Sequence, residues 1–282
     1  MTTTLQLPAD TSLLVATPGA IHSYSRSSQK PLFECATDGI VNARAARDNS
    51  SLLAIADSHL VILHDSERRR DRKYRLKSVE GEPRLLLFSP NSRILYFTST
   101  LSTAIQAYCV PTNELLPPPQ IHPSPPNVLA ISSDGNILLS ASPSPPAIFM
   151  QDLRLGGNAS VNLQSTHPRS PAVIAAFRPD DEYANPSCAK FVLGFQDGTL
   201  SLYRLAIPAK RPSYMDVHLG QSKAFQLQPK KLGSMRKLHK AAIGGITAAG
   251  FLPGYESRLV SAGHDGRCRL VDFEGDGRVL RT

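Results

Sequence analysis

A short alternation of apolar and polar residues recurs along the whole chain. It can be aligned as a six-residue frame whose second position is apolar or Cys and whose fourth is mostly apolar. The frame occurs at Ala20–Ser25, Leu60–Asp65, Ala104–Cys109, Ala147–Asp152, Thr199–Arg204 and Arg267–Asp272. Because successive side chains of a strand point to opposite faces, each frame predicts a strand whose second and fourth side chains turn inward.

The spacing of the frames indicates an internal repeat. Their fifth residues are separated by 40, 44, 43, 52 and 68 residues. These residues are Tyr24, His64, Tyr108, Gln151, Tyr203 and Val271. Such spacing is typical of proteins that iterate one supersecondary unit.

Each frame follows another apolar strand, and most also follow a third strand that ends in a turn. The strands directly before the frames are Leu13–Ala16, Leu52–Ala56, Ile94–Thr98, Ile137–Ala141, Phe191–Gly194 and Leu259–Ala262. The turns before them are rich in Pro, Asp, Asn, Ser and Gly, which start or hold turns. Three or four short antiparallel strands, iterated six times, predict an all-β chain built from blades.

The last repeat carries the most specific motif. Residues 259–273 form a strand, an Asp-Gly turn at Asp265 and an alternating strand that ends in Asp272. With this motif the chain resembles the WD-repeat (WD40) family of β-propellers. The resemblance implies four-stranded antiparallel blades, and it implies that His239, Ser261 and Asp265 form that family's structural hydrogen-bond network.

The chain also departs from the WD40 pattern. It contains no Trp, and Val271 stands where the family's Trp-Asp pair has Trp. The Gly-His pair is absent from the first five repeats, and the terminal Asp occurs only as Asp65, Asp152 and Asp272. The resemblance therefore covers nearly the whole chain as a strand pattern, and propeller families without WD motifs stay open.

Residues 1–282 are predicted to form a single propeller domain of six recognisable blades, with a seventh blade as the alternative. The long interval before the last repeat predicts a basic surface insertion at about 206–240. Within it, Ala224–Leu227 is expected to be the outer strand of the fifth blade. The tail, 277–281, is expected to be the outer strand of the sixth.

The formal net charge of +8 is concentrated in two segments. Residues 67–77 carry a local net charge of +5 and residues 206–240 one of +7, so the rest of the chain is acidic. Basic segments of this kind engage acidic protein surfaces or nucleic acid. The candidate basic patches are Arg68, Arg69, Arg70, Arg72, Lys73, Lys230, Lys231, Arg236 and Lys237.

Other classes of site find no support in the sequence. The four cysteines form no C-x-x-C pair and the eight histidines show no metal-ligand spacing, so no metal site is expected. No phosphate-cradling glycine loop is present, and no cofactor is expected. The N-terminus lacks a secretory pattern and no apolar run is long enough to span a membrane, so we expect an intracellular protein, nuclear or cytoplasmic.

Two residue sets invite a functional interpretation. His239, Ser261 and Asp265 are the residue types of a hydrolytic triad, but the WD40 resemblance implies a structural network, so no catalytic residue is predicted. Asp152 and Arg154 resemble the Asp-x-Arg ending by which WD-repeat substrate receptors engage the propeller adaptor of cullin-4 ubiquitin ligases. An Arg at a strand end can present its planar set of donors to a partner.

The sequence thus predicts a non-enzymatic scaffold or adaptor that binds a protein or peptide, with no small-molecule substrate and no membrane partner. A propeller leaves variable loops on two broad rims, which offer contact area without a reactive centre. Two alternatives stay open. One is a nucleic-acid-associated factor, in ribosome assembly or chromatin, that uses the basic loops. The other is a substrate receptor of a cullin-4 ubiquitin ligase.

Overall fold

The computed structural model describes residues 13–25, 28–47, 51–155, 160–163, 170–179, 188–207, 227–274 and 277–282. Within these ranges the regular elements are β-strands, apart from three short 3-10 helices at Ser78–Glu80, Leu153–Leu155 and Ala241–Ile243. The chain divides into two compact units. The first comprises residues 1–102 and 108–114, and the second comprises residues 103–107 and 115–282.

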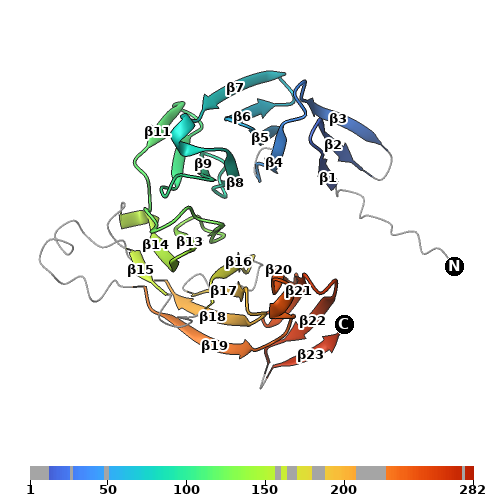
Figure 1. Cartoon of the computed structure of the whole chain (residues 1–282), viewed down its shortest axis with the longest axis vertical. Helices are drawn as coiled ribbons and strands as arrows, with labels where there is room; N and C mark the ends of the chain where they lie inside the picture. The colour runs from blue at the N-terminus through green and yellow to red at the C-terminus, as the bar shows by residue number, and fades with distance from the viewer. Residues whose placement is uncertain are drawn as a thin grey trace, which may run out of the picture. The chain divides into compact units, whose positions relative to one another are not determined.

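The N-terminal half contains three antiparallel sheets in which consecutive strands pair (Figure 1). The first has three described strands, β1 (Leu13–Ala16), β2 (Ala20–Tyr24) and β3 (Gln29–Glu34). The second has four, β4 (Ile40–Ala45), β5 (Leu52–Asp57), β6 (Leu60–Asp65) and β7 (Arg70–Arg75). The third is formed by β8 (Pro83–Phe88), β9 (Ile94–Ser99), β10 (Gln106–Cys109) and β11 (Glu114–Leu116).

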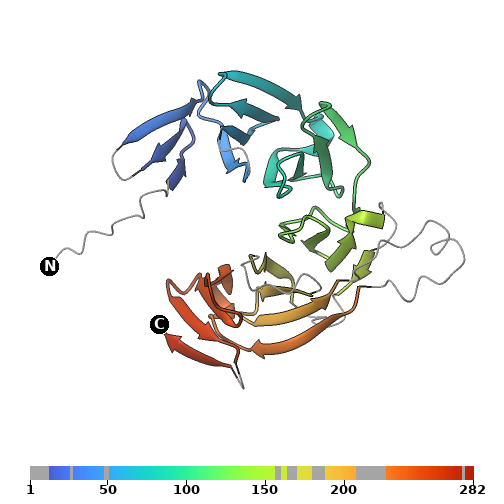
Figure 2. The same cartoon turned by 180° about the vertical axis from the view of Figure 1, so that it is seen from behind.

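The C-terminal half contains three four-stranded sheets of the same design. The fourth sheet is β12 (Val128–Ile131), β13 (Ile137–Pro143), β14 (Pro146–Asp152) and β15 (Ser160–Asn162). The fifth is β16 (Ala172–Phe177), β17 (Cys188–Phe195), β18 (Leu200–Ala206) and β19 (Pro229–Met235). The sixth is β20 (Ile246–Phe251), β21 (Arg258–Gly263), β22 (Cys268–Asp272) and β23 (Arg278–Arg281), and both views show its strands side by side in red (Figure 1 and Figure 2).

The predicted strands are confirmed with small changes at their ends. All six frames and all six strands before them coincide with observed strands, and β6 and β1 match the predicted bounds. The third frame is the least regular, because β10 begins only at Gln106 and Ala104 makes an isolated bridge to Ile121. The C-terminal tail supplies β23, which pairs with β22 as predicted.

The predicted outer strand of the fifth blade was wrong. The structure places this strand at Pro229–Met235, paired with β18, and Leu227 lies before it. Residues 224–226 lie outside the described residues. Part of the predicted insertion at 206–240 is therefore a strand of the sheet.

The inward face predicted by the frame is confirmed in most sheets. Its second position is buried at Ile21, Val61, Ile105, Ile148 and Leu200. Cys268 is exposed, which contradicts the prediction for the last repeat. In the sixth sheet it is the alternate face, with Leu259 and Val271, that packs against the fifth sheet.

Each unit has its core between neighbouring sheets. In the second unit the first strands β12, β16 and β20 contact one another in succession, and in the first unit β4 contacts β8. The fifth sheet is packed on both faces: Phe191 and Tyr203 contribute to one apolar cluster, and Val192 and Leu202 contribute to another. Burial of these side chains supplies the main stabilisation of the sheets.

Candidate functional site

The sixth sheet holds the hydrogen-bond network predicted from the last repeat. His239 Nε2 lies 3.0 Å from Ser261 Oγ, and His239 Nδ1 lies 2.9 Å from Asp265 Oδ1. Arg269 also donates to Asp265 Oδ2 at 3.0 Å. Hydrogen bonds from His239 and then Arg269 hold the pKa of Asp265 well below its usual range, although burial opposes them. The carboxylate therefore stays charged and fixes the imidazole.

Local backbone geometry makes room for this network. A Cβ atom on Gly263 would lie 2.1 Å from His239 Nδ1, so a larger residue would displace the ring. The following turn contains Gly266 with a φ of +70°, which glycine adopts without strain. Gly263, the last residue of β21, and the turn at Gly266 therefore allow His239 to lie close to this hairpin.

The order Ser261–His239–Asp265 matches that of a hydrolytic triad, but a hydrolase also needs a nucleophile that meets its substrate. Ser261 and His239 are each only 1% exposed. A substrate carbonyl cannot reach a hydroxyl buried in this way. The geometry therefore supports a structural role for the three residues.

The fourth sheet contains a shortened version of the same network, which the sequence analysis missed. His122 Nε2 lies 2.9 Å from Ser140 Oγ, and Phe149 packs edge-on against the imidazole at 5.0 Å between ring centroids. His122 precedes β12 much as His239 precedes β20. A search for His a few residues before a first strand and Ser in the second strand would have found it, whereas a search for the Gly-His pair does not.

This second histidine lacks an acidic partner. His122 Nδ1 is buried and makes no hydrogen bond within the described part of the chain. Where the sixth sheet has Asp265, the hairpin between β13 and β14 has a proline-rich turn at 143–146. Burial without a charge partner lowers the pKa of His122 from 6.5 to about 4.

The three terminal Asp residues have one structural role in common. Asp65 accepts the backbone N–H of Glu67, and Asp272 accepts that of Glu274. Asp152 accepts the backbone N–H of Arg154 at 3.0 Å. Each Asp closes the turn that follows the third strand of its sheet.

Arg154, the candidate partner-binding residue, lies folded back on Asp152. Its Nε donates to both carboxylate oxygens at 2.9 and 3.2 Å, and its NH2 donates to Oδ2 at 2.6 Å. The two side chains are 10% and 2% exposed, respectively. The hydrogen bonds that Arg154 donates to Asp152 raise the pKa of Arg154 above its ordinary value. Arg154 was predicted to present its donors to a partner, but in this structure Nε and NH2 donate to the carboxylate of Asp152.

Arg154→Ala is expected to lower the free energy of unfolding by about 2 kcal/mol, because the buried Asp152 loses its charged donor. Urea unfolding followed by circular dichroism measures this loss. Arg258→Ala is the matched control, since Arg258 pairs with Asp272 but is 35% exposed. We expect the control to cost less, about 1 kcal/mol, because Asp272 keeps the Ser257 hydroxyl as a side-chain donor at 2.8 Å. Equal losses in the two variants would contradict the interpretation.

The first basic patch lies on β7 and on the hairpin turn before it. The side chains of Arg68, Arg69, Arg70 and Lys73 are exposed. Arg72 is different, because its guanidinium donates to Val110 O at 2.6 Å and also contacts Asn113 Oδ1. Arg72 therefore braces β7 against the hairpin that joins β10 and β11.

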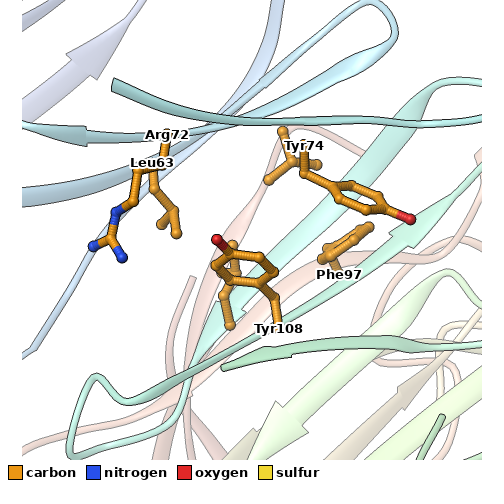
Figure 3. A pocket seen from close by; sticks show the side chains of 7 residues that line it. Leu63, Arg72, Tyr74, Phe97 and Tyr108 are labelled. Carbon is orange, nitrogen blue, oxygen red and sulfur yellow. The ribbon is translucent and has the colours of Figure 1, made fainter. Parts of the chain in front are cut away.

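Behind this brace, aromatic residues fill the space between the second and third sheets. Tyr74 and Phe97 lie 5.6 Å apart between ring centroids, and Tyr108 lines the same pocket (Figure 3). The remaining cavity, about 10 Å³, has room for one water molecule at most. Burial raises the pKa of Tyr74 and of Tyr108, so both phenols stay protonated at neutral pH. This pocket is part of the packing and not a ligand site.

The second basic patch lies on β19 and on the turn after it. In the strand register Lys230 lies opposite Arg204 of β18, and Lys231 lies opposite Tyr203. The patch itself has four residues, and all of them are exposed. Those four are Lys230, Lys231, Arg236 and Lys237. The remaining basic residues of this segment between 208 and 226 lie outside the described residues.

Neither a metal-binding cluster nor a membrane-spanning helix occurs among the described residues. No group of three or more His, Cys, Asp or Glu side chains is arranged there to hold a metal ion. Among the same residues, no helix has the length and apolar character needed to cross a membrane.

Neither a protein-family model nor a curated protein matches the chain. Its fold is similar to that of a chain in a crystal structure of the mitotic checkpoint complex. The TM-score is 0.66 at 15% sequence identity, and the match covers 93% of this chain and 70% of the other. Such low identity shows the fold alone. The chain is an all-β propeller of antiparallel blades, of which the first has three described strands and the others have four.

Proposed function

We propose that the protein is a non-enzymatic scaffold that holds protein partners together in a complex. The observation that carries this proposal is that the His239 network is buried inside the sixth sheet, whereas basic side chains of β7 are exposed and make no ion pair within the described residues. His239, Ser261 and Asp265 are enclosed, whereas Arg70 and Lys73 are exposed. Buried and satisfied polar groups hold a shape, and exposed charged groups on a rigid frame select partners.

The similarity in fold gives limited additional support. The similar chain belongs to a protein assembly, the mitotic checkpoint complex. A propeller presents loops on two rims of a rigid body, which suits protein contacts. The partners of the present chain are proposed to be proteins or peptides.

Two finer functions depend on particular residues. A nucleic-acid-associated role would rely on the two exposed basic patches. A receptor role in a cullin-4 ligase would rely on Arg154, yet the Asp152 carboxylate already binds that guanidinium. The present geometry therefore favours general protein binding over the receptor role.

Affinity purification of the intact chain from its own cells, with and without nuclease, tests the proposal. We expect proteins in stoichiometric amounts that persist after nuclease treatment, because protein contacts do not need nucleic acid. Loss of all partners with nuclease would instead support the nucleic-acid role. Recovery of the cullin-4 adaptor, lost in both Arg154→Lys and Arg154→Ala, would support the receptor role. Absence of any stoichiometric partner would overturn the scaffold proposal.

A further inference from the structure

β7 is an edge strand of unusual composition. Its sheet has the order β4-β5-β6-β7, so one side of β7 faces away from its only paired neighbour among the described strands. Its sequence, Arg-Asp-Arg-Lys-Tyr-Arg, carries four basic side chains and one acidic. An edge strand presents a row of backbone N–H and C=O groups that another extended chain can pair with.

An open cleft lies at each end of β7. The first, of about 580 Å³, is lined by Asp65, Arg68, Arg70, Asp71, Arg72, Val110 and Pro111. The second, of about 450 Å³, is lined by His59, Arg75, Leu76, Lys77 and Ser78. Every residue of both clefts belongs to the first compact unit. We name them the Arg70 cleft and the Arg75 cleft.

The acidic groups in these clefts already have partners, whereas several of the basic side chains do not. Asp71 already pairs with His64 at 2.7 Å, and Asp65 already accepts backbone N–H groups. In contrast, the side chains of Arg70, Lys73 and Arg75 make no hydrogen bond or ion pair within the described part of the chain. The acidic groups are therefore occupied, whereas Arg70, Lys73 and Arg75 are free to bind an anion; Arg68 of the same cleft lies 3.9 Å from Asp65.

Strand geometry sets the size of the ligand. Arg70 and Arg75 are the first and last residues of β7. At about 3.3 Å per residue, a strand of this length spans roughly 17 Å between its ends. An extended peptide of six to eight residues paired with β7 would therefore reach both clefts, so acidic side chains near its two ends would meet Arg70 and Arg75.

The groove also favours a peptide over nucleic acid. Val110 and Pro111 give the Arg70 cleft an apolar wall, which a peptide side chain can contact. Tyr74, the one aromatic residue of β7, turns inward against Phe97 and leaves no ring on which a base could stack. Backbone groups of an edge strand match a peptide backbone and not a sugar-phosphate chain.

We propose that the free edge of β7, with the Arg70 and Arg75 clefts, binds an extended acidic peptide segment of a partner protein by strand addition. This inference rests on the proposed scaffold function, because it names one site and one partner class for it. The peptide backbone pairs with β7, and carboxylates at its two ends meet the free arginines.

Fluorescence anisotropy with a labelled peptide, Glu-Glu-Thr-Val-Thr-Glu-Glu, tests the proposal, because adjacent glutamates at each end present carboxylates to both faces of the strand and so reach both Arg70 and Arg75. We expect saturable binding by the intact chain below about 1 mM, and at least a tenfold increase in Kd for the double variant R68E/R70E. R278E/R281E is the matched control, because it makes the same charge change on the edge strand β23. We expect that control to change Kd by less than about twofold. Equal losses in the two variants would overturn the site.

Two altered probes separate the parts of the proposal. The same peptide with alternate amides N-methylated keeps its charge but cannot pair as a strand, so we expect at least a tenfold weaker Kd. Unchanged binding would overturn strand addition. Tighter binding of a twelve-residue oligo-dT, with the same dependence on Arg68 and Arg70, would overturn the peptide in favour of nucleic acid.

A failure of the β7 peptide site can be distinguished from a failure of the scaffold function. If stoichiometric partners are recovered from cells but the peptide does not bind, only the assignment of β7 as a peptide-binding site is wrong. If the peptide binds as expected but no partner is recovered, the scaffold proposal is wrong, while β7 is still supported as a peptide-binding site. Arg68 and Arg70 are exposed, so the variant is expected to keep the wild-type unfolding midpoint.

Discussion

Replacing His239 with alanine is expected to destabilise the protein by about 3 kcal/mol, since two buried hydrogen bonds are lost together. Ser261 loses its partner at 3.0 Å while it remains 1% exposed, and Asp265 loses its imidazole donor. Arg269 still holds Asp265, so the carboxylate is not left without a charge partner. The free energy of unfolding is measured in urea by far-UV circular dichroism, because the chain contains no Trp.

The neighbouring His264 provides a matched control for this variant. It lies on the same hairpin but is exposed, so His264→Ala is expected to cost less than about 0.5 kcal/mol. Ser261→Ala should cost about 1 kcal/mol, because it removes one of the two bonds. If His239→Ala proves as mild as His264→Ala, the network does not stabilise the sixth sheet and its structural role is wrong.

The strands were predictable because their burial pattern is written in the sequence. In the middle sheets the apolar positions of the frame, such as Val61, Ile148 and Leu200, are the positions that the neighbouring sheets cover. The outer strand of the fifth sheet was misplaced for the opposite reason. The middle of β19, with Lys230 and Lys231, is exposed, so no apolar alternation marks it. Apolar periodicity in a sequence reflects the burial of one face of a strand, and an outer strand is mostly exposed.

The prediction that Cys268 points inward was wrong for a related reason. A frame predicts two alternating faces but not which face a neighbour covers. In the sixth sheet the covered face carries Leu259 and Val271, so Cys268 lies on the other side. Only the packing of whole sheets decides this, and that information is not local.

The sequence predicted which residue types could form a site, but not which of those side chains are free to bind a partner. The charge pattern pointed to Arg72 as readily as to Arg70, and the Asp-x-Arg resemblance pointed to Arg154. The structure shows that Arg72 braces two sheets and that Arg154 pairs with Asp152, whereas Arg70 has no partner within the described residues. Hydrogen-bond acceptors from distant segments, such as Val110 O, decide which cations are free.

Acidification from pH 6.5 to pH 4 is expected to destabilise the wild-type protein by about 3 kcal/mol through His122 alone. Burial lowers the pKa of His122 from 6.5 to about 4, so the unfolded chain takes up a proton in this range while the folded chain does not. Stability from this residue is thus complete above pH 6.5 and is lost as the pH falls toward 4. His122→Gln, which keeps a polar group near Ser140 without the titration, is expected to remove this slope.

Carboxylates act in a different pH range, so the contribution of His122 can be isolated. Hydrogen bonds lower the pKa of Asp65, Asp265 and Asp272 below 3.8, and the stability they give is lost mainly as the pH falls below that value. Urea unfolding at half-unit steps between pH 7 and pH 4 therefore reports on His122. His59→Gln, a change at an exposed histidine, is the control and should leave the slope unchanged. A wild-type slope that survives in His122→Gln would show that another group titrates, and that the buried imidazole without an acid partner is not the source of acid sensitivity.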